Sequence, residues 1–143
     1  MNLRFWWTKS LFKLRHEEAD NQIALVRWFR IQYPELSELL VSYPAGMNLS
    51  LSQRIRARNM GLTAGVPDLI LFVPMIIGRQ FCPCLFIEMK SKNGKLSEVQ
   101  KSYHRRLKKM GYTIVVSYSF EEAKDEIVRY LDGYRDKWFH ELI

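Results

Sequence analysis

The sequence predicts an α/β fold in which helices flank a small mixed β-sheet. Short, apolar, partly β-branched segments of strand length alternate with longer segments whose apolar residues recur every three or four positions. A helix-length segment separates the last two strand candidates, which predicts a right-handed crossover between parallel strands. With 143 residues, 48% of them hydrophobic, the chain suits one domain with one core. We therefore expect a single domain over residues 1–143.

The first predicted element is a helix over Glu17–Gln32, whose apolar residues form one broad stripe. Before it, residues 1–16 mix aromatic and apolar side chains with Arg and Lys, which favours an arm that docks onto a partner over a helix lying on a membrane surface. We divide the expected domain into this arm, a core over 17–131 and a C-terminal tail over 132–143.

A short helix should follow the turn-rich segment SYPAGMNLS, because Ser50 or Ser52 can cap its first turn and Gly61 can end it. Next, LILFV after Asp68 and LFIEM after Cys84 predict the two arms of a β-hairpin, with Gly78 in the connection. Pro83 indicates that the second arm becomes regular only beyond it.

The next predicted helix begins at a capping box formed by Ser97 and Gln100 and ends at Gly111. The residues expected to line its apolar face are Val99, Tyr103, Leu107 and Met110. A third strand, YTIVVSY, should then lead into a helix capped by Ser119 and Glu122. The apolar residues of that last helix are Ala123, Ile127, Val128 and Leu131. The aromatic residues expected in the core are Trp28, Phe29, Tyr103 and Tyr118.

Charge and cysteine content narrow the function classes. Lys and Arg number 22 against 15 Asp and Glu, and the net charge of +7 favours an anionic partner such as DNA. The two cysteines, Cys82 and Cys84, are too close for an ordinary disulfide and too few for a thiolate zinc site. No apolar run reaches the ~20 residues of a membrane helix. We expect a cytoplasmic protein with no membrane partner.

One group of residues carries recognisable chemistry. Glu88 and Lys90 are two positions apart on a strand, so both side chains leave the same face, and the hairpin brings Asp68 alongside. Two close carboxylates repel one another unless a cation lies between them. Mg²⁺ or Mn²⁺ would suit these oxygen ligands, and Lys90 could orient or deprotonate a water and offset phosphate charge. The pattern predicts metal-assisted phosphodiester hydrolysis.

The segments GVPDL and IEMK, with Glu18 on the first helix, resemble the Pro-Asp…Glu-X-Lys nuclease superfamily, which implies a restriction-endonuclease-like core. The longer runs ARNMGLTAGVPDLILFVP and LFIEMKSKNGKLSEVQKSYHRRLKKMGYTIVVSYSFEEA are similar to its VRR-NUC branch, the virus-type replication-repair nucleases. The similarity is greatest to stand-alone phage or prophage members and covers about Glu17 to Leu131. It implies a protein encoded by a phage or prophage and acting in a bacterial cytoplasm.

The resemblance implies a role for each matching residue. The catalytic set would be Asp68, Glu88, Lys90 and Gln100. The metal would be held by Glu18, Asp68, Glu88 and the backbone carbonyl of Met89, with Glu17 as the competing first-helix acid. The segment SYPAGMNLS departs from the family pattern, so Asn48 receives no role.

Each of these residues also has a purely structural interpretation. Glu88 and Lys90 could form a plain ion pair, Asp68 could be a turn residue, and Glu18 could serve only the helix dipole. The residues expected to contact DNA phosphates are Arg54, Arg56, Arg58, Lys92, Lys101, Arg105 and Lys108. His104 beside them is expected to be exposed or to face DNA rather than to bind metal.

We therefore expect an Mg²⁺- or Mn²⁺-dependent DNA endonuclease acting on branched or duplex DNA. The resemblance to stand-alone family members implies that it is structure-selective, with Holliday junctions or flaps as candidate substrates, and that it acts in DNA repair. A homodimer would present paired sites to opposed strands. The aromatic residues expected to anchor it are Trp6, Trp7, Trp138 and Phe139. The alternatives are a non-catalytic basic DNA-binding module and a sequence-specific restriction enzyme.

Overall fold

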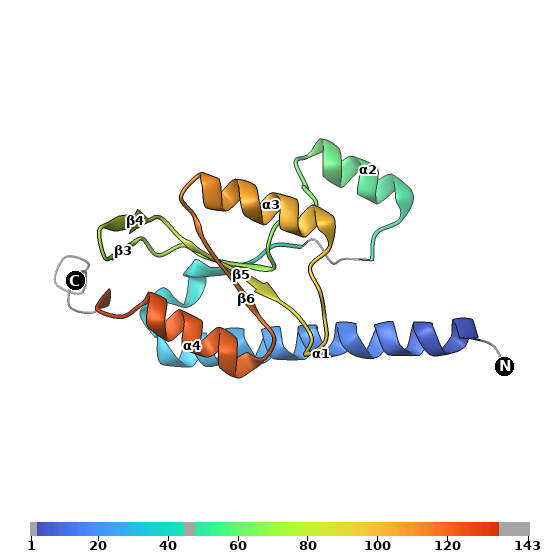
Figure 1. Ribbon diagram of the computed structural model, residues 1–143, viewed down its shortest axis with the longest axis horizontal. Coiled ribbons are helices and arrows are strands. Elements are labelled where there is room, and N and C mark those ends of the chain that lie inside the picture. The colour runs from blue at the N-terminus through green and yellow to red at the C-terminus, as the bar shows by residue number, and fades with distance from the viewer. Residues whose placement is uncertain (1–2, 45–47, 135–143) are drawn as a thin grey trace.

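The computed structural model describes residues 3–44 and 48–134, with side chains from His16 onward. A four-stranded sheet, in the order β1-β2-β5-β6, lies between helices (Figure 1). Helices α1 and α4 cover one face and contact each other, α3 lies on the other face, and α2 stands apart from the sheet. The helices are α1 (Leu3–Gln32), α2 (Leu51–Asn59), α3 (Glu98–Lys109) and α4 (Phe120–Tyr130). The strands of the sheet are β1 (Leu40–Ser42), β2 (Leu69–Leu71), β5 (Leu85–Met89) and β6 (Thr113–Ser117).

The pairing of the strands confirms the predicted mixed sheet. Strand β2 is antiparallel to both β1 and β5, with Leu69 opposite Ile87. Strand β5 is parallel to β6, with Glu88 opposite Val116, and α3 connects the two. The prediction that LFIEM and TIVVS are parallel strands joined through a helix is therefore correct.

The connection between β2 and β5 differs from the simple hairpin that we expected. The predicted strand LILFV ends at Leu71, and a separate hairpin of β3 (Met75–Ile77) and β4 (Gln80–Cys82) follows, with its turn at Gly78, where φ is +64°. Only the base of this hairpin packs into the core, since the paired Met75 and Cys82 are buried whereas the residues nearer the turn are exposed. As expected, β5 begins only after Pro83.

Helix α1 begins well before the predicted start at Glu17 and runs without a break across the boundary between the predicted arm and core. The segment LRFWWTKSLFKLRH contains neither Pro nor Gly, so nothing in it stops a helix from continuing. Its C-terminal end at Gln32 agrees with the prediction, because Pro34 begins the 3-10 helix η1 (Pro34–Leu39). Strand β1 and η1 were not predicted.

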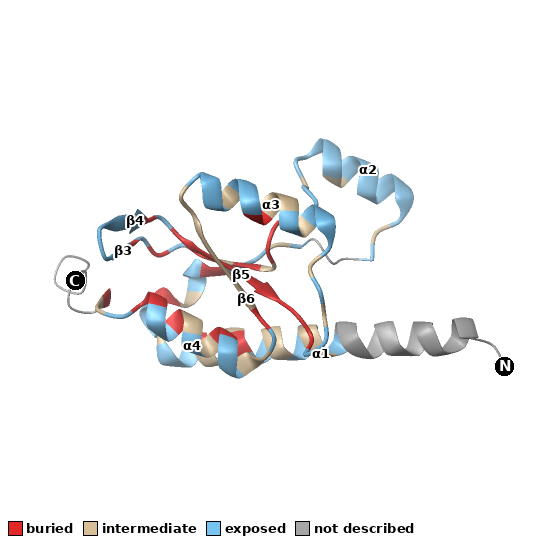
Figure 2. Cartoon of the chain, viewed as in Figure 1, coloured by how far each residue is buried: buried red, intermediate tan, exposed pale blue. Residues whose placement is uncertain are grey.

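The core lies between the sheet and the α1–α4 layer (Figure 2). Its fully buried side chains include Leu25 and Phe29 from α1, Leu69 and Leu71 from β2, Ile87 and Met89 from β5, and Ala123 and Ile127 from α4. Tyr134, in the predicted tail, also belongs to this core. Cys82 and Cys84 are buried free thiols. In the part of the chain that the structure describes, no helix is long and apolar enough to cross a membrane.

Two predictions about which side chains are buried are wrong. Tyr118 is 37% exposed rather than part of the core, and Val99 and Met110, the two ends of the predicted α3 stripe, are 55% and 77% exposed. Helix α3 turns Gln100 and His104 toward the sheet instead. The four aromatic residues expected to anchor a dimer lie outside the residues whose side chains the structure describes.

Candidate active site

The site forms where β2 begins and β5 ends. Asp68 immediately precedes β2, and its Oδ2 accepts a hydrogen bond of 2.8 Å from the backbone N–H of Met89. The backbone carbonyl of Asp68 accepts a bond of 2.8 Å from the N–H of Tyr43, so β1 and β5 hold this residue from opposite sides. The hairpin-like pairing therefore brings Asp68 to Glu88, as the sequence predicted.

The approach to Asp68 depends on Gly65. This residue has φ +88°, a conformation that favours glycine, and a Cβ there would lie 2.8 Å from the carbonyl oxygen of Val99 and 3.0 Å from Tyr103 Cβ. The loop before β2 thus packs directly against the backbone of α3. This contact sets the spacing between Asp68 and the helix that carries Gln100.

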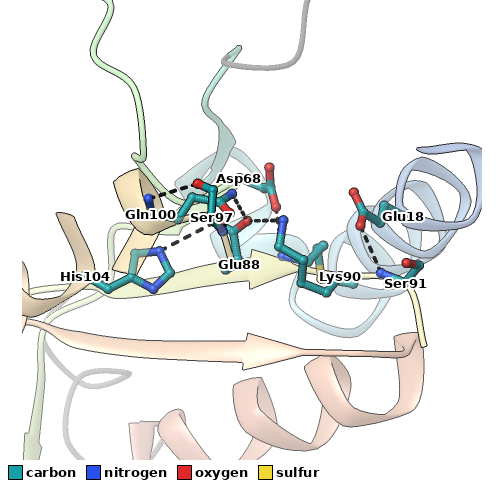
Figure 3. Close-up of polar contacts among 9 residues, drawn as sticks. Glu18, Asp68, Glu88, Lys90, Ser91, Ser97, Gln100 and His104 are labelled. Atoms are coloured by element: carbon teal, nitrogen blue, oxygen red, sulfur yellow. Dashed lines mark hydrogen bonds and ion pairs between the residues drawn. The ribbon is translucent and has the colours of Figure 1, made fainter. Parts of the chain in front are cut away.

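Glu88 is the centre of the site. Its side chain is completely buried, and its Oε1 lies 2.8 Å from Lys90 Nζ and 2.6 Å from Gln100 Nε2 (Figure 3). Lys90 follows β5 directly, and its backbone N–H bonds to the carbonyl of Ser117 on β6. The predicted presentation of Glu88 and Lys90 on one face of the strand is confirmed.

Gln100 forms the predicted capping box and also contacts Glu88, and its catalytic role stays a prediction. Its Oε1 accepts a bond of 2.9 Å from the N–H of Ser97, and the Ser97 hydroxyl accepts one of 3.2 Å from the N–H of Gln100. This capping box fixes the first turn of α3. The same amide directs its N–H group at Glu88, so a helix cap also serves as a donor in the site.

The two first-helix acids bind the segment after Lys90. Glu18 Oε1 accepts a bond of 3.0 Å from the N–H of Ser91, and Glu17 Oε1 accepts one of 3.3 Å from the N–H of Lys92. A Cβ at Gly94 would lie 3.3 Å from Glu18 Oε1, so the turn packs closely on this carboxylate. Both acids therefore have a structural role, and ligation of a metal by Glu18 stays a prediction.

Burial and mutual repulsion perturb the acids strongly. Burial, and after it the charge of Asp68, raises the pKa of Glu88 to about 7, although the bond from Lys90 opposes the shift. Burial also raises the pKa of Asp68, against the bond from Met89. For Lys90, burial lowers the pKa, but the hydrogen bond and charge of Glu88 outweigh it and the net pKa is raised. Lys90 is therefore a cation at neutral pH beside two carboxyls that ionise reluctantly.

The donor set fits a hard divalent cation held by few protein ligands. Among the described residues, no three His, Cys, Asp or Glu side chains gather as a metal-holding group. Asp68 and Glu88 remain, and Glu88 Oε2 is a buried oxygen without a hydrogen-bond partner in the described part of the chain. Mg²⁺ keeps several waters and needs only one or two carboxylates. Met89 presents its backbone here, but its carbonyl as a ligand stays a prediction.

His104 is the residue that the sequence reasoning misplaced. It is 5% exposed rather than solvent- or DNA-facing, and its Nε2 lies 3.6 Å from Glu88 Oε2. The signal that could have found it is its spacing from Gln100, because residues four apart on a helix share a face. If Gln100 faces Glu88, His104 must face it too.

The predicted phosphate-contacting residues are all on the surface. Helix α2 buries none of its residues, and it carries Arg54, Arg56 and Arg58. On α3 the side chain of Lys101 bonds to that of Glu98 at 2.7 Å, and Arg105 and Lys108 are exposed. Lys92, which follows β5, is exposed as well. Contact of these residues with DNA stays a prediction.

Comparison with known proteins decides the family. A family model described as the VRR-NUC domain matches residues 11–121. The chain belongs to the VRR-NUC family. A solved structure named "VRR_NUC domain protein" is similar to it, with 27% sequence identity, a TM-score of 0.64, and coverage of 80% of this chain and 88% of that one. A search of curated proteins found no match.

This membership confirms the family and fold that the sequence predicted. The VRR-NUC domain implies a nuclease-type function, and the mixed sheet flanked by helices agrees with the solved VRR-NUC relative. The origin from a phage or prophage stays a prediction.

Proposed function

We propose that this VRR-NUC protein is an Mg²⁺- or Mn²⁺-dependent DNA endonuclease. The observation that supports it most is the arrangement around Glu88, which has Lys90 and Gln100 on one oxygen and Asp68 within its electrostatic reach. Asp68 and Glu88 would hold the cation. When bound, such a cation lowers the pKa of a coordinated water and stabilises the charge that develops on the phosphate.

The remaining work falls to the side chains of the protein. The raised pKa keeps Lys90 protonated, which favours orienting the water and offsetting phosphate charge over acting as a base. Gln100 fixes the Oε1 side of Glu88 from the capped end of α3. Glu17 and Glu18 hold the turn after Lys90, so the lysine backbone is fixed on both sides.

We infer further that the substrate is branched DNA and that two copies act together. The exposed arginines of α2 and the basic residues of α3 support contact with DNA phosphates. One site of this kind cuts one strand, so opposed strands call for a homodimer. Light scattering tests the dimer, and a particle of 17.1 kDa at micromolar concentration would contradict it.

Cleavage of four-way junctions, flaps and plain duplex DNA, with Mg²⁺, Mn²⁺ or EDTA, tests the enzyme. Asp68→Ala and Glu88→Ala should reduce metal-dependent cleavage to background, whereas Asp125→Ala, at an exposed acid of α4, should cut like the wild type. Lys90→Ala should cut about 10²–10⁴-fold more slowly and still bind metal.

Absence of metal-dependent cutting on all three DNAs would remove the enzyme proposal. In that case salt-dependent DNA binding without metal binding would identify a basic binding module. Equal cutting of junction and duplex would remove the structure selectivity alone.

A further inference from the structure

His104 is a buried polar side chain that the proposed mechanism does not yet use. It extends from α3, and its Nε2 lies 3.6 Å from Glu88 Oε2 (Figure 3). Within the described residues, neither of these two buried atoms has a hydrogen-bond partner. Unpaired buried polar atoms are costly, so a pair that faces each other at slightly more than bonding distance calls for an explanation.

The acceptor positions of the Glu88 carboxylate explain this arrangement. An ionised carboxylate has about four acceptor positions, two on each oxygen. Lys90 Nζ and Gln100 Nε2 occupy both positions of Oε1. Both positions of Oε2 are open, and His104 faces this oxygen. Oε2 is therefore the oxygen left for a cation, with a second lone pair left for the imidazole.

The position of the imidazole proton decides whether His104 can donate to Glu88. A neutral imidazole carries one proton, and only the tautomer with that proton on Nε2 can donate to the carboxylate. Because Gln100 and His104 are one turn apart, α3 then offers one donor to each oxygen of Glu88.

We propose that His104 is a positioning residue whose Nε2–H donates to Glu88 Oε2 and fixes the orientation in which this carboxylate meets a divalent cation. The role rests on the proposed metal-dependent function. A ligating carboxylate is commonly oriented by such outer hydrogen bonds, and their loss typically costs 10–100-fold in metal affinity.

Titration calorimetry with Mn²⁺, without DNA, tests the proposal. His104→Met, which has no N–H donor, should lower the Mn²⁺ affinity 10–100-fold. His104→Gln, of similar size and with an amide donor, should restore most of the loss. Arg106→Met, on the exposed side of the same helix, should leave the affinity unchanged. If His104→Met does not fold, His104→Asn replaces it, since its shorter side chain withdraws the donor.

Equal affinities of the Met and Gln variants would overturn the proposal, because packing alone would then account for His104. Nitrogen-15 NMR of the metal-free protein gives a second measurement. The proton of His104 should reside on Nε2, and a proton on Nδ1 would contradict the role.

These results separate the proposal from the nuclease function. Wild-type protein that binds Mn²⁺ and cuts DNA, with His104→Met doing both equally well, removes the role of His104 and leaves the enzyme intact. Wild-type protein that binds no Mn²⁺ removes the metal-dependent function and the role of His104 with it.

Discussion

Helices α3 and α4 lie on opposite faces of the sheet, and both contact β6. Each begins at a serine whose hydroxyl accepts a bond from the third residue of the helix. Yet α4 buries Ala123, Ile127 and Tyr130, whereas the one buried residue of α3 is His104. Two similar amphipathic patterns therefore serve different ends, since α4 completes the core and α3 supplies the polar side of the site.

The cause lies in the sheet between them. Strand β5 is buried along its whole length and presents Glu88 to α3 and apolar side chains to the α1–α4 layer. A buried carboxyl needs donors, so the helix facing it must offer polar groups where it would otherwise offer apolar ones. Substitutions on the two helices should accordingly separate stability from metal binding and cleavage.

The largest expected effect is on α4. Ile127 is completely buried, so Ile127→Ala should lower the free energy of unfolding by about 2–5 kcal/mol. Urea unfolding measures this loss, and Mn²⁺ affinity of the folded protein should be unchanged. Val128→Ala, at the next residue and 47% exposed, is the control and should cost within about 0.5 kcal/mol. A Mn²⁺ affinity lost in parallel with stability would break the separation.

On α3 a substitution should instead lower the metal affinity and change the stability little. Gln100→Met removes the donor to Glu88 Oε1 and should lower metal affinity 10–100-fold, with only the stability loss of a broken helix cap, about 0.5–2 kcal/mol. Gln53→Met is the matched control, because Gln53 occupies the same position in the capping box of α2. Unlike Gln100, it does not donate to the buried carboxylate of Glu88. Equal metal affinities of the two variants would show that Gln100 serves the helix alone.

Glu88 also predicts how stability depends on pH. Its pKa in the folded, metal-free protein is raised from 4.5 to about 7, so the folded state binds more protons than the unfolded state between these values. Its contribution to stability should therefore fall as pH rises from about 4.5 to 7, and Asp68 adds in the same direction. His104, whose pKa is lowered, opposes it.

Comparison of the wild type with Glu88→Gln isolates this contribution. Thermal unfolding with EDTA should show a shallower decline with pH for the variant, and Mn²⁺ should reverse the decline for the wild type. Identical pH profiles in EDTA would contradict the shift.

The smallest effect concerns the outer end of α3. Met110 is 77% exposed, so Met110→Lys should change the free energy of unfolding by less than about 0.5 kcal/mol. Chemical denaturation measures this change in the free energy of unfolding. A larger loss would mean that the apolar stripe expected from the sequence does pack, and that the contrast between the helices is weaker than described.

The sequence predictions were accurate for the apolar core that α4 completes and less accurate for the polar side that α3 supplies. Strands β5 and β6 were predicted from short apolar, partly β-branched runs, and helix α4 was predicted because apolar periodicity reports burial in a core, as at Ala123 and Ile127. Asp68, Glu88 and Lys90 were found because their chemistry is readable from a short motif. His104 was misplaced because it stands in the sequence beside the basic residues of α3, which were expected on an exposed face.

Other features left no sequence signal strong enough to use. Strands β1, β3 and β4 have three residues each, too few for a pattern to emerge from a turn-rich segment. Glu17 and Glu18 could not be separated because both do similar work, each accepting a bond from a successive backbone N–H after Lys90. The long extension of α1 was missed because its aromatic and basic residues suggested an arm.

The loop before β2 packs so closely on α3 at Gly65 that this position should tolerate no other residue. Any larger residue would place its Cβ 2.8 Å from a carbonyl oxygen of α3 and would adopt an unfavourable φ. Helix α3 would have to shift away from the sheet, and Gln100 and His104 would move away from Glu88 with it. A saturation screen for nuclease loss should therefore rank this glycine with the acids themselves, although it has no functional group to lose.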